Sequence, residues 1–151
     1  METVISLNEF SRSIESRCIE FYKTCVLKTN QFSTKYILQK LIEQHKKHIK
    51  KLDLEFSFEG EEPLNSGHLE NYTMQFSKAW QISAFDIENL NFVEATKLAI
   101  SLINFQIDFY RQLTEEISGP EFQEIIEKII VFKTDYIKEL ESEFERLSYK
   151  K

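Results

Sequence analysis

The sequence predicts an all-α protein, an up-down four-helix bundle built from two related helical hairpins with one long crossover between them. Only three glycines and two prolines occur in 151 residues, too few for the many turns of an all-β domain. Apolar residues recur at steps of three and four over four long stretches, which is the period of amphipathic helices. The second half of the chain also repeats the first. A chain of this length fits a single domain, residues 1–151.

The first predicted helix begins at a capping box, because Ser6 is followed three residues later by Glu9. Ile5 and Phe10 have the spacing of a hydrophobic staple, and we expect the helix to run to about Thr29. A second helix follows "TNQFS". Its apolar seam contains two histidines at positions where apolar residues would be usual: Leu38, Leu41, His45, His48 and Leu52.

The crossover is expected at about residues 58–90. Its first part, "SFEGEEPLNSG", holds two of the three glycines and one proline and therefore predicts a break. A short amphipathic helix should follow, with apolar residues at Leu69, Tyr72, Phe76 and Trp80. His68, beside the glycine break, is expected to be exposed.

The third helix repeats the capping logic with Asn91 and Glu94, and should run from about Phe92 to Ile117. The sequence "SGP" then ends this helix and opens the fourth. The fourth seam again includes polar residues: Ile126, Ile129, Lys133, Tyr136, Leu140 and Leu147.

The repeat aligns the two halves at one offset. "IEFYK" begins at Ile19 and "IDFYR" begins 88 residues later, at Ile107. The same offset aligns "HIKKLDLEF" (48–56) with "YIKELESEF" (136–144). A shared amphipathic period would not also match residues off the seam, so we interpret the chain as two related hairpins around a pseudo-twofold axis.

Charge, hydropathy and cysteine spacing limit which partners and which cellular compartment are expected for this chain. The net charge of −6 argues against binding of nucleic acid, which requires a basic surface. We assign the one basic run, Lys46–Lys51, to a solvated helix face. No stretch is long and apolar enough for a membrane span, and the N-terminus lacks the pattern of a signal peptide, so we expect a cytoplasmic protein. Cys18 and Cys25 are too far apart on one helix for a disulfide and should be buried, reduced thiols. A homodimer through an exposed apolar helix face is possible.

Three phrases resemble the rubrerythrin-like branch of the ferritin-like superfamily: "ESRCIEFY", "KKHIKKL" and "DIENLNFVEATKLAISLI". The resemblance covers nearly the whole chain. It implies a ferritin-like bundle and a di-iron centre held by four carboxylates and two histidines, used for peroxide or oxygen reduction or for iron handling. Two divalent cations in a low-dielectric interior need about that many anionic ligands.

This sequence keeps only part of that ligand set. Glu15 and His48 match the family's glutamate of helix one and histidine of helix two, but His45 stands where the resemblance implies a glutamate. In the second hairpin, Ile103 replaces a glutamate, and Lys133 and Tyr136 replace the glutamate and histidine pair. A standard di-iron peroxidase is therefore not expected, and whether the chain is an enzyme at all stays open.

Several interpretations of the interior residues remain. In one, no metal binds, because the Lys133 ammonium lies opposite Glu15 and replaces the lost cation, while Tyr136 and the histidines close a hydrogen-bond network. Tyr22 and Tyr110 occupy the same position of the repeat, and we expect both to have a structural role, with their hydroxyls hydrogen-bonded inside the bundle.

In another, Glu15, His45 and His48 hold a single Fe, Mn or Zn ion as a two-histidine, one-carboxylate set. A third leaves Glu15 in water at the edge of its seam, with the histidines as satisfied core residues. A non-metal role as an interaction protein, or as a binder of a small ligand in a cavity near Glu15, Ile103 and Tyr136, is also consistent with the sequence.

Overall fold

A computed structural model of the chain describes residues 6–56, 66–83, 89–117 and 119–148, with side chains except at 66, 79–83 and 147–148. Over these ranges the protein is all-helical, as predicted, and no strand occurs. Five helices follow one another: α1 Leu7–Lys28, α2 Phe32–Leu52, α3 Ser66–Ser83, α4 Phe92–Glu116 and α5 Pro120–Ser148. The expected helix ends agree with these bounds within a residue or two.

The two hairpins begin with the same local device. The Ser6 hydroxyl accepts a hydrogen bond from the Glu9 backbone N–H at 3.1 Å, and the Asn91 side-chain oxygen accepts one from the Glu94 N–H at 2.8 Å. Each contact satisfies a backbone donor that the first helical turn would otherwise leave without a partner. Both predicted caps are therefore confirmed. The predicted staple involves Ile5, which lies outside the described residues.

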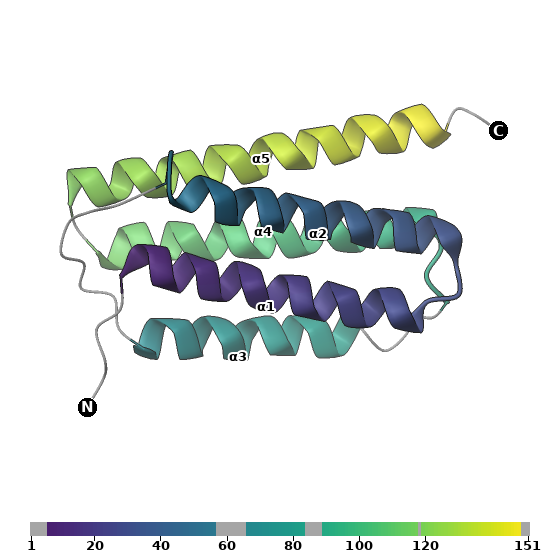
Figure 1. The fold of residues 1–151 in the computed structure, drawn as a ribbon, viewed down its shortest axis with the longest axis horizontal. Coiled ribbons are helices and arrows are strands. Elements are labelled where there is room, and N and C mark those ends of the chain that lie inside the picture. The colour runs from purple at the N-terminus through teal and green to yellow at the C-terminus, as the bar shows by residue number, and fades with distance from the viewer. Residues whose placement is uncertain (1–5, 57–65, 84–88, 118, 149–151) are drawn as a thin grey trace.

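The long helices lie side by side with nearly parallel axes, and α3 flanks them on one side (Figure 1). α1 packs against α2, α4 against α5, and α2 against α4, while α3 contacts α1 and α4. Helices within each hairpin run in opposite directions. α2 and α4 run in the same direction, because α3 carries the chain back along the bundle before α4 begins. The predicted up-down alternation thus applies within each hairpin and not between the two.

Aromatic side chains attach the crossover helix to the bundle. Tyr72 of α3 packs edge-on against Phe109 of α4, with ring centroids 4.6 Å apart, and Phe76 lies 5.9 Å from Phe105. Tyr72 and Phe76 are both buried, as their helical spacing predicted. The predicted seam residues Trp80 and Leu147 belong to the residues whose side chains are not described.

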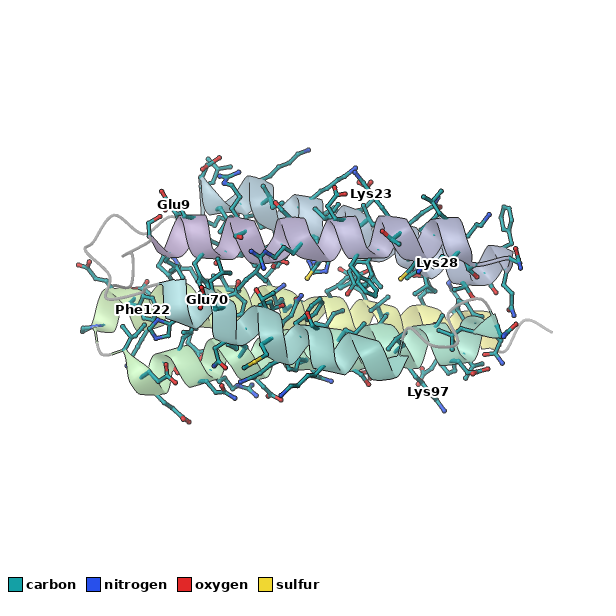
Figure 2. All side chains as sticks on the ribbon, turned by 90° about the horizontal axis from the view of Figure 1, so that it is seen from below. Glu9, Lys23, Lys28, Glu70, Lys97 and Phe122 are labelled. Carbon is teal, nitrogen blue, oxygen red and sulfur yellow. The ribbon has the colours of Figure 1, made fainter. Side chains whose placement is uncertain are left out.

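Charged side chains cover the outside of the bundle. Figure 2 shows Lys23 and Lys97 pointing away from it on opposite sides. Within the basic run Lys46–Lys51, three lysines are exposed and His48 is buried, which agrees with the predicted solvated face. Among the described helices, none combines the length and apolar character that a membrane crossing would require.

Candidate functional site

Polar side chains from four helices meet in the interior. We call this group the interior polar cluster. No member is more than 4% exposed, although each carries a group that water normally solvates. The members are Glu15 and Cys18 of α1, His45 and His48 of α2, Gln106 of α4 and Lys133 of α5.

Glu15 lies at the centre of the cluster. His45 Nδ1 is 2.5 Å from its Oε2, and since an ionised carboxylate can only accept, the histidine nitrogen must donate. Lys133 Nζ donates to Oε1 at 2.6 Å. The carboxylate is 0% exposed, so these two contacts replace the water that it would bind at the surface. The alternative that placed Glu15 in water at the edge of its helix face is wrong.

His48 approaches the same carboxylate differently. Its Nδ1 lies 2.7 Å from Glu15 Oε1, within ion-pair distance, but the alignment is not that of a hydrogen bond. Neither ring nitrogen of His48 forms a hydrogen bond with a described residue. The ring packs edge-on against Phe56 and Phe132, at 5.2 and 5.7 Å between centroids. His48 is therefore held mainly by aromatic neighbours.

A second series of contacts runs from the lysine back to α1. Lys133 Nζ also donates to Gln106 Oε1 at 2.8 Å, and Gln106 Nε2 donates to Cys18 Sγ at 2.9 Å. Cys18 and Gln106 are 88 residues apart, so they occupy the same position in the two halves of the repeat. The amide consequently joins the lysine of the second hairpin to the thiol of the first.

The electrostatics of the cluster follow from its burial and its cation. Burial alone would raise the pKa of Glu15, but His48, Lys133 and His45 together hold that pKa well below its ordinary value of 4.5. Burial lowers the pKa values of His45 and His48, against the opposing effect of Glu15. Near neutral pH the cluster thus contains an ionised glutamate and two neutral histidines, and the Lys133 nitrogen that donates to the glutamate is its counter-charge.

Two of the predicted tyrosines border the cluster. Tyr22 stacks on His45 with centroids 5.3 Å apart, and Tyr110 stacks on His48 at 6.5 Å. The Tyr110 hydroxyl lies 3.1 Å from Ser11 Oγ, a hydrogen-bonding distance. Burial raises the pKa of both phenols well above 10. The hydrogen bond predicted for Tyr110 is thus present.

Tyr136 does not join this network. Its hydroxyl is buried but has no hydrogen-bond partner in the described part of the chain. Tyr136 lines a groove with Tyr36 and Lys40 at the surface between α2 and α5. Tyr136 follows Lys133 by three residues, and of these two side chains only the lysine reaches the cluster.

Sequence reasoning assigned no site role to Cys18 or Gln106. Cys18 follows Glu15 by three residues and so shares its helix face, which was the available signal, and Gln106 occupies the matching position in the repeat. His68, expected to be exposed, is only 21% exposed, and its Nε2 lies 3.2 Å from Glu116 Oε2.

Three of the side chains could hold a metal ion. One ligand atom each from Glu15, Cys18 and His45 lies within 4.8 Å of the others, and all three residues are buried. The expected set had His48 in place of Cys18. A di-iron centre does not fit, because the cluster holds one carboxylate and an ammonium, and Ile103 is apolar.

Burial also limits the chemistry. A catalytic acid, base or nucleophile must touch its substrate, and every member of the interior polar cluster is enclosed by the helices. Burial raises the pKa of the Cys18 thiol, so it is protonated and weakly nucleophilic. The arrangement stabilises charge and offers no reactive group to an outside molecule.

Comparisons with family models, with curated proteins and with solved structures each returned no match for this chain.

Proposed function

We propose that this chain is a non-catalytic binding protein built on a ferritin-like plan, in which the Lys133 ammonium takes the place that a metal cation has in di-iron bundles. The single observation that carries the proposal is the buried ion pair of Lys133 Nζ and Glu15 Oε1, at 2.6 Å. The antiparallel hairpins, the lengthwise crossover helix and the contact of Cys18 with Gln106 support the plan.

Charge is the reason that the lysine and a metal exclude one another. A divalent ion beside Glu15 would lie close to the Lys133 ammonium, and two cations repel strongly in a low-dielectric interior. The ion pair already balances the charge of the glutamate, and Gln106 Oε1 accepts a second hydrogen bond from the lysine. The fold therefore needs no metal to neutralise its interior.

Metal content and thermal stability test this proposal together. Protein purified without chelator should contain far less than one equivalent of Fe, Mn or Zn. Its melting temperature should be the same with EDTA and with added metal, since a ligand that binds only the native state raises that temperature. Stoichiometric metal that resists dialysis, together with a melting temperature that falls on chelation, would contradict the proposal.

A second candidate function, binding of one transition-metal ion, is favoured by the proximity of Glu15, Cys18 and His45. Sulfur and imidazole ligands suit zinc and cobalt. The site would have to rearrange, because His45 Nδ1 and Glu15 Oε2 are 2.5 Å apart, whereas two ligands about 2.0 Å from a tetrahedral ion lie roughly 3.3 Å from each other. The thiol proton and the Lys133 contact would also have to be lost.

Cobalt titration distinguishes the two candidates. A Cys18 thiolate on Co²⁺ would produce a sulfur-to-cobalt charge-transfer band in the near ultraviolet. That band should be lost in Cys18→Ser and kept in Cys25→Ser, which changes the other buried thiol of the same helix. We expect no such band in the native protein. Its appearance with this dependence on Cys18 would establish the metal function instead.

A further inference from the structure

A groove runs along the surface between the end of α2 and the first half of α5. Its volume is about 730 Å³. Of its lining residues, Phe56 is buried and Phe132 half-buried, and we call these two rings the floor. Leu54, Val131, Glu127 and Asp135 are exposed, and we call the two carboxylates the rim. Leu54 is 79% exposed and Val131 54% exposed, so two aliphatic side chains that line the same groove are both open to solvent.

The floor of the groove is already formed. Phe56 and Phe132 lie 5.6 Å apart in an edge-to-face arrangement, and both rings contact His48 beneath them. Lys51 Nζ lies 5.5 Å from the centre of the Phe132 ring and donates to Glu55 at 2.9 Å. These contacts fix the aromatic floor, so a partner would meet a preorganised surface and lose less entropy in binding it.

The charge of the rim determines which kind of partner the groove would favour. Glu127, Val131 and Asp135 are spaced four residues apart and so share one face of α5. Among the described residues, neither Glu127 nor Asp135 has an ion-pair partner, whereas the two lysines of the groove each have an acidic neighbour. An exposed apolar strip therefore lies between two carboxylates whose charge the described residues do not balance.

Two other occupants have the wrong charge. A second copy of this chain carries a net charge of −6 and would bring the same acidic rim to a symmetric contact. Residues 57–65 of the chain itself include Glu59, Glu61 and Glu62 and no basic residue, so they also repeat the sign of the rim. A basic partner complements it.

We propose that this groove binds an amphipathic helix of a partner protein, with leucine-like residues on its apolar face and lysines or arginines flanking that face. The apolar face would cover Leu54 and Val131, and the basic flanks would pair with Glu127 and Asp135. Helix-in-groove recognition uses this combination of apolar anchors at helical spacing and charge at the edges. The groove would supply the binding surface of the non-catalytic protein proposed above, and the inference rests on that function.

Two synthetic helical peptides test the proposal by fluorescence anisotropy with the full-length protein. Both carry the same leucine face, and one has lysine flanks where the other has glutamate flanks. We expect the native protein to prefer the lysine peptide. Reversing the charge of the rim with Glu127→Lys and Asp135→Lys should lower the affinity for the lysine peptide about tenfold and raise the affinity for the glutamate peptide.

Matched variants separate the groove from general attraction to an acidic protein. Glu20→Lys with Glu115→Lys changes the net charge equally, at two exposed positions outside the groove, and should keep the preference. Leu54→Ser with Val131→Ser should lower the affinity for the lysine peptide. Leu27→Ser, which changes an 87% exposed leucine at the end of α1, should not.

Several results would overturn the proposal. Equal binding of the two peptides, equal effects of the two charge-reversal pairs, or no binding would each reject a basic helix as the occupant. A native dimer that Leu54→Ser with Val131→Ser converts to a monomer would assign the groove to a second copy. If Leu54→Ser with Val131→Ser lowered the melting temperature of the free protein by several degrees, other residues of the chain would already cover the groove. Metal content is measured separately, so failure here leaves the metal-free interior untouched.

Discussion

The two hairpins are similar in sequence and differ at the centre of the bundle. Both begin with a capped helix, and both place a tyrosine at the same point of the repeat, Tyr22 and Tyr110, beside a histidine of α2. Where the first hairpin has Glu15, the second has Ile103. Three further positions of the repeat also differ in chemistry. His45 aligns with Lys133, Cys18 with Gln106, and His48 with Tyr136.

This difference shows how a bundle can balance its interior charge without symmetry. The first hairpin supplies the anion and two neutral bases, and the second supplies the cation and an amide that connects it to Cys18. Each hairpin has one internal hydrogen bond in the cluster, but the buried glutamate and the buried lysine find their opposite charge only in the other hairpin. Burial of the cluster therefore ties the two halves together, because separating them would leave Glu15 and Lys133 unpaired in an apolar interior.

The largest effect should come from removing the cation. Lys133→Met leaves Glu15 buried without a counter-charge, and we expect the free energy of unfolding to fall by about 3–5 kcal/mol. Urea denaturation followed by circular dichroism measures it. Lys128→Met is the control, because Lys128 is an exposed lysine of the same helix and should change stability by less than about 0.5 kcal/mol. Similar values for the two variants would show that the buried pair contributes nothing special.

Acid should destabilise the protein in two stages. The pKa values of His45 and His48 are lowered in the folded state, so below their ordinary value of 6.5 the unfolded chain binds more protons and stability falls. The pKa of Glu15 is also lowered, so its contribution is complete above 4.5 and is lost as the pH falls from there through the folded value. Chemical denaturation between pH 8 and pH 2 measures both stages.

The contribution of His45 to the first stage can be separated from that of His48. His45→Gln cannot titrate but can still donate to Glu15, so the loss of stability just below pH 6.5 should be smaller in this variant. Identical pH profiles for the native protein and His45→Gln would contradict the assignment.

The smallest effects should be equal in the two hairpins. Ser6→Ala and Asn91→Ala each remove a helix cap, and each should cost about 1 kcal/mol of unfolding free energy. Thermal denaturation of the two variants compares them directly. A large loss in one variant and none in the other would show that the hairpins differ at their helix starts as well as at their centre.

The helices were predictable because their signals are local. Caps at Ser6 and Asn91, the helical spacing of apolar residues and the glycine-rich break each depend on a few neighbouring residues. The site was predictable in part: His45, His48 and Lys133 stood out as polar residues on apolar seams, and Glu15 stood out through the family resemblance of its helix. Cys18 and Gln106 did not, because a thiol and an amide gain their roles only from contacts across helices, which sequence spacing does not specify.

Tyr136 shows the same limit from the other side. It lies on the seam of α5, and burial was predicted correctly, but a side chain one turn from Lys133 points to a different neighbour. Helix rotation and axial position decide which of two adjacent polar residues reaches the centre. These quantities depend on packing over the whole bundle.

A double-mutant cycle on Glu15 and Lys133 tests the central claim most directly. The free energies of unfolding of the native protein, Glu15→Gln, Lys133→Met and the double variant give the energy of interaction between the two side chains. We predict that each single change is strongly destabilising and that the double variant is more stable than the sum of both predicts, by about 0.5–3 kcal/mol. Additive effects would contradict the account, because they would mean that the lysine does not neutralise the buried glutamate.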